Sequence, residues 1–425
     1  MRSDFMPSPR AAAVAVIVML ALGVALGSAT GQLAQSAGLT TILLEEPPPP
    51  SDEEPMPEAA AAEPEAAAEA APEPAAAAPP VPQEAPLAEE PLPSEPEPEA
   101  PVIEEEPTGM PEVKHVFVIM LGENGYEETF GEGSSSEYLG KELPAQGELL
   151  PNYFAVTKGE LANQIALLSG QGPTPETQAD CPNYGDVAPG TESPEGQVEG
   201  NGCVYPATTT TLLGQLAEAG LKWRAYIDEE EAAAEAEAPG GCYLTPRNPF
   251  AYFHAFTDKG ECGADAGLAQ LSRDLTLEPE RFPALAYVSP DPAVSEETLK
   301  TIVPRIEESL AYKDGGLIAI TSAQARESGE EPEFSGCCLY PDYPNVEEPE
   351  SAEPVTGPVR ESGGGGQVGA LLLSPFIEPG TTDETYFNHF SLLATIEELF
   401  GLEKIGYAAE PAIAGFDESV FNADS

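Results

Sequence analysis

The sequence predicts an α/β domain over residues 113–425, with a mostly parallel central sheet and helices on both of its faces. Two observations support this prediction. Residues 113–121 form a nearly continuous apolar run rich in β-branched side chains, as expected for a strand that is buried on both faces. Short apolar strands then alternate with stretches of helical spacing, which is typical of a parallel sheet whose crossover connections are helices.

The expected elements follow one another along the whole domain. After the first strand, the spacing of leucines predicts a helix that stops at Gly220. The expected strands are 113–121, 222–227, 285–289, 317–321 and 368–374, and the expected helices are 208–219, 296–312 and 390–400. The loops between them are long at 173–206, 229–249 and 327–366, and long loops in such folds often build a site.

The N-terminus is expected to target a membrane. Arg2 and Arg10 precede an apolar run over 11–27, and this order places the N-terminus inside and the remainder outside. Residues 1–28 are therefore interpreted as a signal anchor or a signal peptide, with the uncleaved anchor preferred. The expected location is the cell membrane with an extracytoplasmic domain, or secretion if the segment is cleaved.

Residues 29–112 are expected to be a disordered acidic stalk. The stretch 45–112 consists mainly of Pro, Ala and Glu and contains no Lys or Arg. Such a segment cannot bury enough apolar surface to offset the entropy of its chain.

The charge and the cysteines restrict the partners and the compartment. The formal net charge is −57, which repels nucleic acid and anionic surfaces, so a nucleic-acid partner is excluded. The six cysteines all follow the stalk and favour disulfides in an exported chain. Cys181 is expected to bond to Cys203, and adjacent Cys337 and Cys338 are expected to bond to different partners, with Cys242 and Cys262 as the remaining candidates.

Several motifs of the domain resemble the bacterial phosphoesterase family, which holds phospholipase C-type and acid-phosphatase-type enzymes of the alkaline-phosphatase-like superfamily. The motifs occur in the family's order over nearly all of 113–421. They are Lys114–Asn124 with Phe130–Gly131, Leu150–Thr157, Ala166–Gly170, Trp223–Tyr226, Arg247–Phe253, Ala311–Ile318, Gly364–Ile377, Phe387–Leu393 and Phe400–Leu402. The resemblance implies an alkaline-phosphatase-like fold.

The resemblance also implies where a site would lie. Phosphate-ester hydrolysis of this kind needs an activated hydroxyl and metal ions held by oxygen or imidazole ligands. The family's ligand positions match Glu123 and Asn124 after the first strand and His389 before the last helix. These three residues are expected remnant ligands of a divalent metal, if any function of the site survives.

Other parts of the family's site are replaced. The family has a His-Pro-Ser/Thr segment where this chain has Lys158-Gly159-Glu160, so Glu160 stands at the position of the nucleophile. A carboxylate there would repel a phosphate dianion. Residues 294–298 replace the family's Asn-Asp-x-His-Asp cluster, and 322–324 replace an Asp-Glu pair.

The sequence therefore favours a degenerate member of the family that has lost hydrolysis and is kept as an extracytoplasmic binding or envelope module, with an unidentified phosphate-ester or envelope ligand. An active phosphoric-ester hydrolase with a rebuilt site, using substitutes such as Asp291 or Glu296, is the alternative. The third hypothesis is that the domain is a purely structural head on a stalk. Glu123, Asn124 and Gly125 could also be only a solvated turn, and His389 only a helix-entry residue.

Overall fold

The structure is a computed structural model that describes residues 109–228, 244–260, 266–292, 295–325, 334–338, 343–346 and 358–423. The chain divides into the units Met1–Glu97 and Pro98–Ser425, and all described residues belong to the second. The predicted segment 1–28 and nearly all of the predicted stalk lie outside the described residues, so both stay predictions. Among the described residues, no helix has the length and apolarity needed to cross a membrane.

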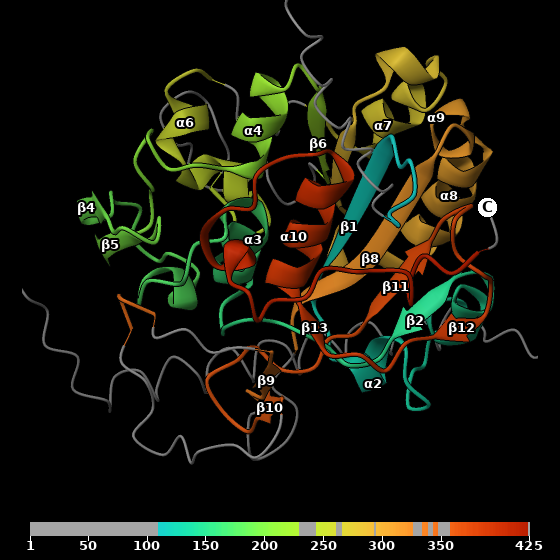
Figure 1. Ribbon diagram of the computed structural model, residues 1–425, viewed down its shortest axis with the longest axis horizontal. Helices are drawn as coiled ribbons and strands as arrows, with labels where there is room; N and C mark the ends of the chain where they lie inside the picture. Colours follow the sequence, from blue (N-terminus) through green and yellow to red (C-terminus); the bar gives the residue numbers. More distant parts are fainter. Residues whose placement is uncertain are drawn as a thin grey trace, which may run out of the picture. The chain divides into compact units, whose positions relative to one another are not determined.

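A seven-stranded sheet is the centre of the described part, in the order β12-β2-β11-β8-β1-β7-β6 (Figure 1). Neighbouring strands pair in parallel except at β11, which runs antiparallel to both β8 and β2. The mostly parallel sheet predicted from the sequence is therefore confirmed. The strands are β1 (His115–Glu123), β2 (Glu148–Leu150), β6 (Trp223–Ile227), β7 (Leu285–Ser289), β8 (Gly316–Gln324), β11 (Ala370–Leu373) and β12 (Thr381–Thr382).

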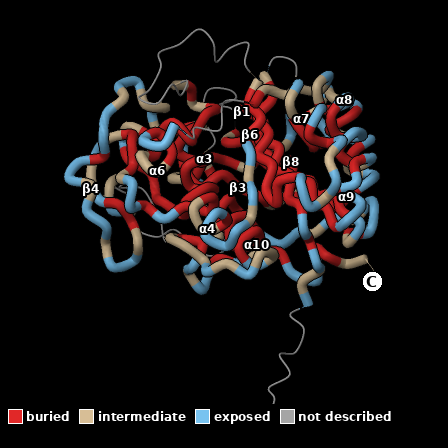
Figure 2. Tube along the Cα trace, turned by 90° about the horizontal axis from the view of Figure 1, so that it is seen from above, coloured by how far each residue is buried: buried red, intermediate tan, exposed pale blue. Residues whose placement is uncertain are grey.

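Helices cover both faces of this sheet, as Figure 2 shows from above. Successive side chains of β1 enter opposite cores, because residues of a strand alternate between its faces. Val116, Val118 and Met120 belong to one core, whereas Phe117, Ile119 and Leu121 belong to the other. The first core includes α3 (Glu160–Ser169), α4 (Leu212–Glu218) and α10 (His389–Leu399), and the second includes α7 (Leu268–Asp274), α8 (Ser295–Glu308) and α9 (Leu310–Lys313).

Local chemistry sets the ends of the helices. At α4, the Thr211 hydroxyl accepts a hydrogen bond from the Gly214 N–H, which satisfies a free donor of the first turn. Asn388 and Ser391 form a reciprocal capping box at the start of α10. The expected helix 296–312 is divided into α8 and α9, because Ser309 is extended and caps α9 through Tyr312 N–H.

Short elements complete the described part. The hairpin of β4 and β5 lies in the long loop that begins at residue 173. The short strands and helices are α2 (Tyr126–Thr129), β3 (Tyr153–Phe154), β4 (Ala188–Glu192), β5 (Val198–Asn201), α6 (His254–Thr257), β9 (Gly336–Cys337), β10 (Val359–Arg360) and β13 (Phe387–Asn388). Single turns lie at η1 (Tyr138–Glu142), η2 (Pro144–Gln146), η3 (Thr177–Ala179), η4 (Pro249–Tyr252), η5 (Pro279–Arg281) and η7 (Gly406–Ala409).

Candidate functional site

Two of the residues predicted for the site, Glu123 and Glu160, lie at the carboxyl ends of the central strands. Glu123 is the last residue of β1, and Gln324, the last residue of β8, lies opposite it in the parallel register. Helix α3 begins beside them at Glu160. In open α/β sheets this edge is where ligands bind.

Gln324 joins the two sides of this edge. Its side-chain amide donates a hydrogen bond to the Glu123 carboxylate. Its carbonyl oxygen accepts the Gly159 backbone N–H at 2.6 Å. One neutral side chain therefore connects the carboxylate after β1 to the entrance of α3.

The backbone before α3 is held in an unusual conformation. Gly159 has φ +93°, and a Cβ there would come within 2.7 Å of the Thr177 carbonyl oxygen, so only glycine fits. Buried Asn163 braces the same turn: its side-chain oxygen accepts from the N–H groups of Val156 and Thr157, and its amide donates to the carbonyls of Thr157 and Gly159.

Asp180 supplies the cap that Gly159 cannot. Its carboxylate accepts a hydrogen bond from the Leu161 N–H at 2.9 Å, in the first turn of α3. Free N–H groups at a helix N-terminus are a general anion site. Here a side chain of the chain itself takes that position.

The electrostatics of the edge are unfavourable for a further anion. Burial raises the pKa of Asp180, and the nearby Glu123 charge raises it too, whereas the N–H groups of α3 lower it. A Cβ on Gly122 would lie 3.7 Å from the Glu160 carboxylate, so Glu160 also faces this edge. Three acidic side chains therefore converge at the start of α3.

A few groups of opposite or neutral character surround Glu160. The buried Arg247 guanidinium donates to the Pro290 carbonyl after β7 at 3.1 Å. Burial raises the pKa of Tyr287, the Glu160 charge raises it further, and Arg247 lowers it. The Tyr287 hydroxyl donates to the Gln164 side chain at 2.5 Å. Glu160, Tyr287 and Arg247 are thus electrostatic neighbours.

His389 is fully buried, and both of its ring nitrogens have partners. Nε2 lies 2.9 Å from the Ala323 carbonyl oxygen, and because a carbonyl only accepts, Nε2 carries the hydrogen. Nδ1 then accepts from the Tyr153 hydroxyl at 3.0 Å. Burial lowers the pKa of His389 to about 4, so the ring is neutral at pH 7.

The described arrangement does not fit the divalent metal that the resemblance implies. His389 has no free lone pair, and one oxygen of Glu123 already accepts from Gln324. Across the described residues, no three His, Cys, Asp or Glu side chains are grouped so that they could hold a metal. Asn124 lies partly buried after β1. The assignment of Glu123, Asn124 and His389 as remnant ligands stays a prediction.

Glu296, a substitute named for a rebuilt site, lies in other surroundings, and the nearest hydroxyl residues before and after Glu160 in the sequence, Thr157 and Ser169, are both buried. Glu296 binds Lys300 at 2.8 Å on α8, which lowers the pKa of Glu296. The Ser169 hydroxyl donates to the Ile165 carbonyl within α3 and is buried. Thr157 is also fully buried, and its hydroxyl accepts from Gln178.

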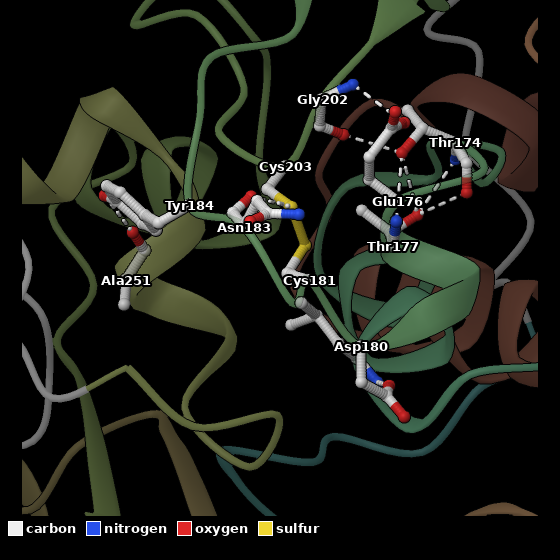
Figure 3. Close-up of a disulfide and its surroundings, with 11 residues drawn as sticks. Thr174, Glu176, Thr177, Asp180, Cys181, Asn183, Tyr184, Gly202, Cys203 and Ala251 are labelled. Carbon is white, nitrogen blue, oxygen red and sulfur yellow. Dashed lines mark hydrogen bonds between the residues drawn. A yellow bond between two sulfur atoms is a disulfide. The ribbon is translucent and has the colours of Figure 1, made fainter. Parts of the chain in front are cut away.

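A disulfide supports the loop that carries Asp180 (Figure 3). Cys181 bonds to Cys203, which confirms the predicted pair. Next to it, the Thr174 N–H donates to the Thr177 hydroxyl, and the Thr174 hydroxyl donates to the Gly202 carbonyl. The Gly202 N–H donates to the Glu176 carboxylate, so hydrogen bonds join both sides of the loop. The loop that carries Asp180, the cap of α3, is therefore cross-linked by a disulfide.

The prediction for the adjacent cysteines was wrong. Cys337 and Cys338 bond to each other rather than to different partners. The Cys338 residue has φ +84°, a left-handed conformation that sequence spacing does not reveal. Cys242 and Cys262 lie outside the described residues.

Sequence reasoning missed most of the residues that organise this edge. Asp180, Asn163 and Arg247 were not singled out, and Gln324 was noted only as part of a lost acidic pair. The signal for Asn163 was the Gly-Glu-Leu-Ala-Asn order after a strand, but a buried amide brace has no distinct sequence pattern.

The comparisons with known proteins agree with part of this description. The Phosphoesterase family model matches residues 338–403, a segment that includes β11 and α10. No protein of curated function matches the sequence. The match covers 66 of the 425 residues and shows that this segment is similar to the Phosphoesterase family.

Several solved structures share parts of the chain path. A protein in the alkaline phosphatase superfamily from Vibrio parahaemolyticus is 12% identical, with 71% of each chain covered and a TM-score of 0.41. The lipoteichoic acid synthase LtaP from Listeria monocytogenes is 11% identical over 73% of this chain and 76% of its own, with a TM-score of 0.42. A putative sulfatase from Bacteroides thetaiotaomicron is 10% identical over 74% and 76%, with a TM-score of 0.40. No functional residue is transferred from these chains.

Proposed function

We propose that residues 113–425 are a phosphoesterase-family domain, of the phospholipase C or acid-phosphatase type, that has lost ester hydrolysis. In this proposal the domain is an extracytoplasmic binding module, carried on the stalk and held at the membrane by the N-terminal segment. The family match over 338–403 and the mostly parallel sheet support the ancestry.

One observation carries the proposal: the edge that would receive a phosphate ester is filled by the chain's own side chains. The Gln324 amide binds the Glu123 carboxylate, and the Asp180 carboxylate binds the first turn of α3. In an active site of this type, a cation would face the first position and a phosphoryl oxygen the second.

The nucleophile is the second reason. Glu160 stands where the family has a hydroxyl, and it faces the edge together with Glu123 and Asp180. A phosphate dianion approaching these carboxylates would be repelled at short range. The hydroxyls of Thr157 and Ser169 are buried and hydrogen-bonded, so neither replaces the missing group.

The extracytoplasmic placement rests on composition and covalent chemistry. The Cys181–Cys203 bond is of the kind that persists in oxidising compartments. The charged flank and apolar run of residues 1–28 supply the expected export signal.

The proposal is tested by turnover. The full chain is incubated with calcium, magnesium, manganese or zinc and assayed with p-nitrophenyl phosphate and bis(p-nitrophenyl) phosphate. We expect no hydrolysis above the rate of the Glu123→Ala variant. Hydrolysis that is abolished by Glu123→Ala would instead establish the alternative, an active hydrolase with a rebuilt site.

A further inference from the structure

A cavity lies at the amino ends of the central strands, opposite the candidate site. It has a volume of about 360 Å³ and is lined by residues at the amino ends of β1, β6 and β7. His115, which lines it, and Glu123 are the first and last residues of the nine-residue strand β1, so they lie about 26 Å apart at about 3.3 Å per residue. It is therefore separate from the edge that Gln324 closes, and its occupancy is independent of the proposed function.

His115 forms the floor of this cavity and has one ring nitrogen without a partner. The residue is only 6% exposed. Nδ1 lies 2.9 Å from the Pro283 carbonyl oxygen, so Nδ1 must donate and carry the hydrogen. Burial lowers the pKa of His115, which keeps the ring neutral at pH 7. Nε2 therefore bears a lone pair, and no described side chain or backbone group donates to it.

Two opposite charges on the rim also lack a charged partner within the described part of the chain. The Lys222 ammonium reaches only the Glu280 backbone carbonyl, at 3.5 Å. The Glu280 carboxylate forms no ion pair there, yet it is close enough to raise the pKa of His115. Of the remaining charged groups, Lys114 pairs with Asp314 at 3.4 Å and with Glu112 at 4.0 Å.

The walls between these groups are apolar. Leu221, Phe282 and Ala284 line the cavity, and the Phe282 ring packs edge-on against His115 with centroids 5.7 Å apart. The cavity thus offers a cation, an anion, a neutral acceptor and a small apolar wall. Its size is at the lower end of ligand pockets.

We infer that this cavity binds a small zwitterion of the α-amino acid class, with the ligand ammonium donating to His115 Nε2 and facing Glu280, and the ligand carboxylate facing Lys222. A zwitterion matches each open group and adds no net charge. A simple anion would leave the acceptor nitrogen unsatisfied and would face Glu280 and Asp314. A simple cation would leave Lys222 without a partner and would face Lys114.

The probe is L-leucine, added to the full chain and followed by the ¹⁵N resonances of the imidazoles. The chain has three histidines, so the His115 signals can be assigned by substitution. We expect saturable shifts of His115 Nε2, with His254 and His389 unchanged. Unchanged His115 resonances up to the solubility limit of L-leucine would overturn the inference.

Three small probes separate the parts of the ligand. Glycine betaine keeps both charges but has no N–H to donate, whereas acetate and methylammonium each keep one charge. We expect glycine betaine and acetate, which cannot donate to Nε2, to bind at least about tenfold more weakly than L-leucine, since a hydrogen bond to a charged group is worth about 1.5–3 kcal/mol. Methylammonium keeps this donor but loses the carboxylate that faces Lys222, so we expect it to bind at least about twofold more weakly. Equal binding of betaine or of acetate would contradict the assigned role of Nε2.

Two variants test the side chains independently. His115→Phe removes the acceptor and is expected to weaken L-leucine by at least about tenfold. Lys222→Met changes only an exposed rim residue, so folding is retained, and is expected to weaken it about two- to fivefold. Lys141→Met, at an exposed lysine paired with Glu137, is the control and should have no effect. An unchanged affinity in Lys222→Met would overturn the carboxylate position.

Protonation of the ring gives a final readout. Acid pH converts Nε2 from acceptor to donor and places a cation among Lys114, Lys222, Glu280 and Asp314. We expect L-leucine affinity to fall as His115 is protonated, in parallel with its own NMR titration. An affinity that rises over the same range would contradict the inference.

Discussion

Replacing Gln324 by methionine removes the link that closes the candidate site. The change keeps the length of the side chain but deletes its donor to Glu123 and its acceptor for the Gly159 N–H. A hydrogen bond to a charged group contributes about 1.5–3 kcal/mol and a neutral one about 0.5–1.5 kcal/mol. Glu123 and Gln324 are partly exposed, so hydrogen bonds to water replace part of the free energy that the variant loses. We expect a loss of about 2–3 kcal/mol of unfolding free energy.

Urea unfolding of the full chain at pH 7 measures this loss. Gln146→Met is the matched control, because Gln146 is exposed and donates only to the Glu142 carbonyl. It should change stability by less than about 0.5 kcal/mol. A double-mutant cycle with Glu123→Gln should return a coupling energy on the order of 1 kcal/mol. If Gln324→Met were as stable as the control, Gln324 would not hold the edge together.

Three pH-dependent predictions follow from the buried and paired groups. Hydrogen bonds to Asp258 and Asp186 raise the pKa of His254. Its contribution to the free energy of unfolding is therefore full below its unfolded pKa and is lost as pH rises through its folded pKa. Asp186→Asn should lower the pKa of His254 measured by NMR. Burial lowers the pKa of His389 to about 4. Its contribution to the free energy of unfolding is therefore full above its unfolded pKa near 6.5 and is lost as pH falls from 6.5 toward 4. A His389 imidazole that titrates near 6.5 in the folded chain would contradict the described burial. Burial raises the pKa of Glu397 to about 8, and its Oε2 has no hydrogen-bond partner. The free energy of unfolding should therefore fall as pH rises from 4.5 to 8. Glu397→Gln should remove this decline in urea unfolding, and an equal decline in the variant would show that another group causes it.

Periodicity predicted the fold well because the central strands are buried on both faces. Residues 113–121, 222–227, 285–289 and 317–321 are short apolar runs, and each corresponds to a strand of the sheet. The helix predicted at 390–400 corresponds to α10, whose apolar side chains fill one core. The reversed direction of β11 could not be predicted, since an apolar strand reads the same for either direction.

Helix α3 shows where pattern reasoning fails. Its residues are buried nearly all round, so no polar stripe marks it as a helix. Its start depends on a glycine conformation and on a cap from Asp180, which is 20 residues beyond Glu160 in the sequence. Contacts between residues so far apart are set by the tertiary fold.

The shared edge of Glu123 and Glu160 could be predicted from the sequence, but the contacts of the predicted site residues could not. Glu123 and Glu160 do lie at one edge, since the carboxyl end of β1 and the start of α3 meet there. The engagement of Glu123 by Gln324, and of both His389 nitrogens by Tyr153 and Ala323, depends on side-chain placement. Likewise, Cys337 and Cys338 were expected to form disulfides with different partners, whereas they form a disulfide with each other.

Metal content tests the central claim most directly. The full chain is dialysed against calcium, magnesium, manganese and zinc in turn and then analysed for bound metal, beside the Glu123→Ala variant. The described edge predicts no stoichiometric metal that depends on Glu123, because Gln324 binds one oxygen of that carboxylate and His389 has no free lone pair. In addition, no three His, Cys, Asp or Glu side chains of the described residues are grouped so that they could hold a metal. One equivalent of metal in the wild type, lost in Glu123→Ala, would show that the edge still holds a metal and would contradict the account.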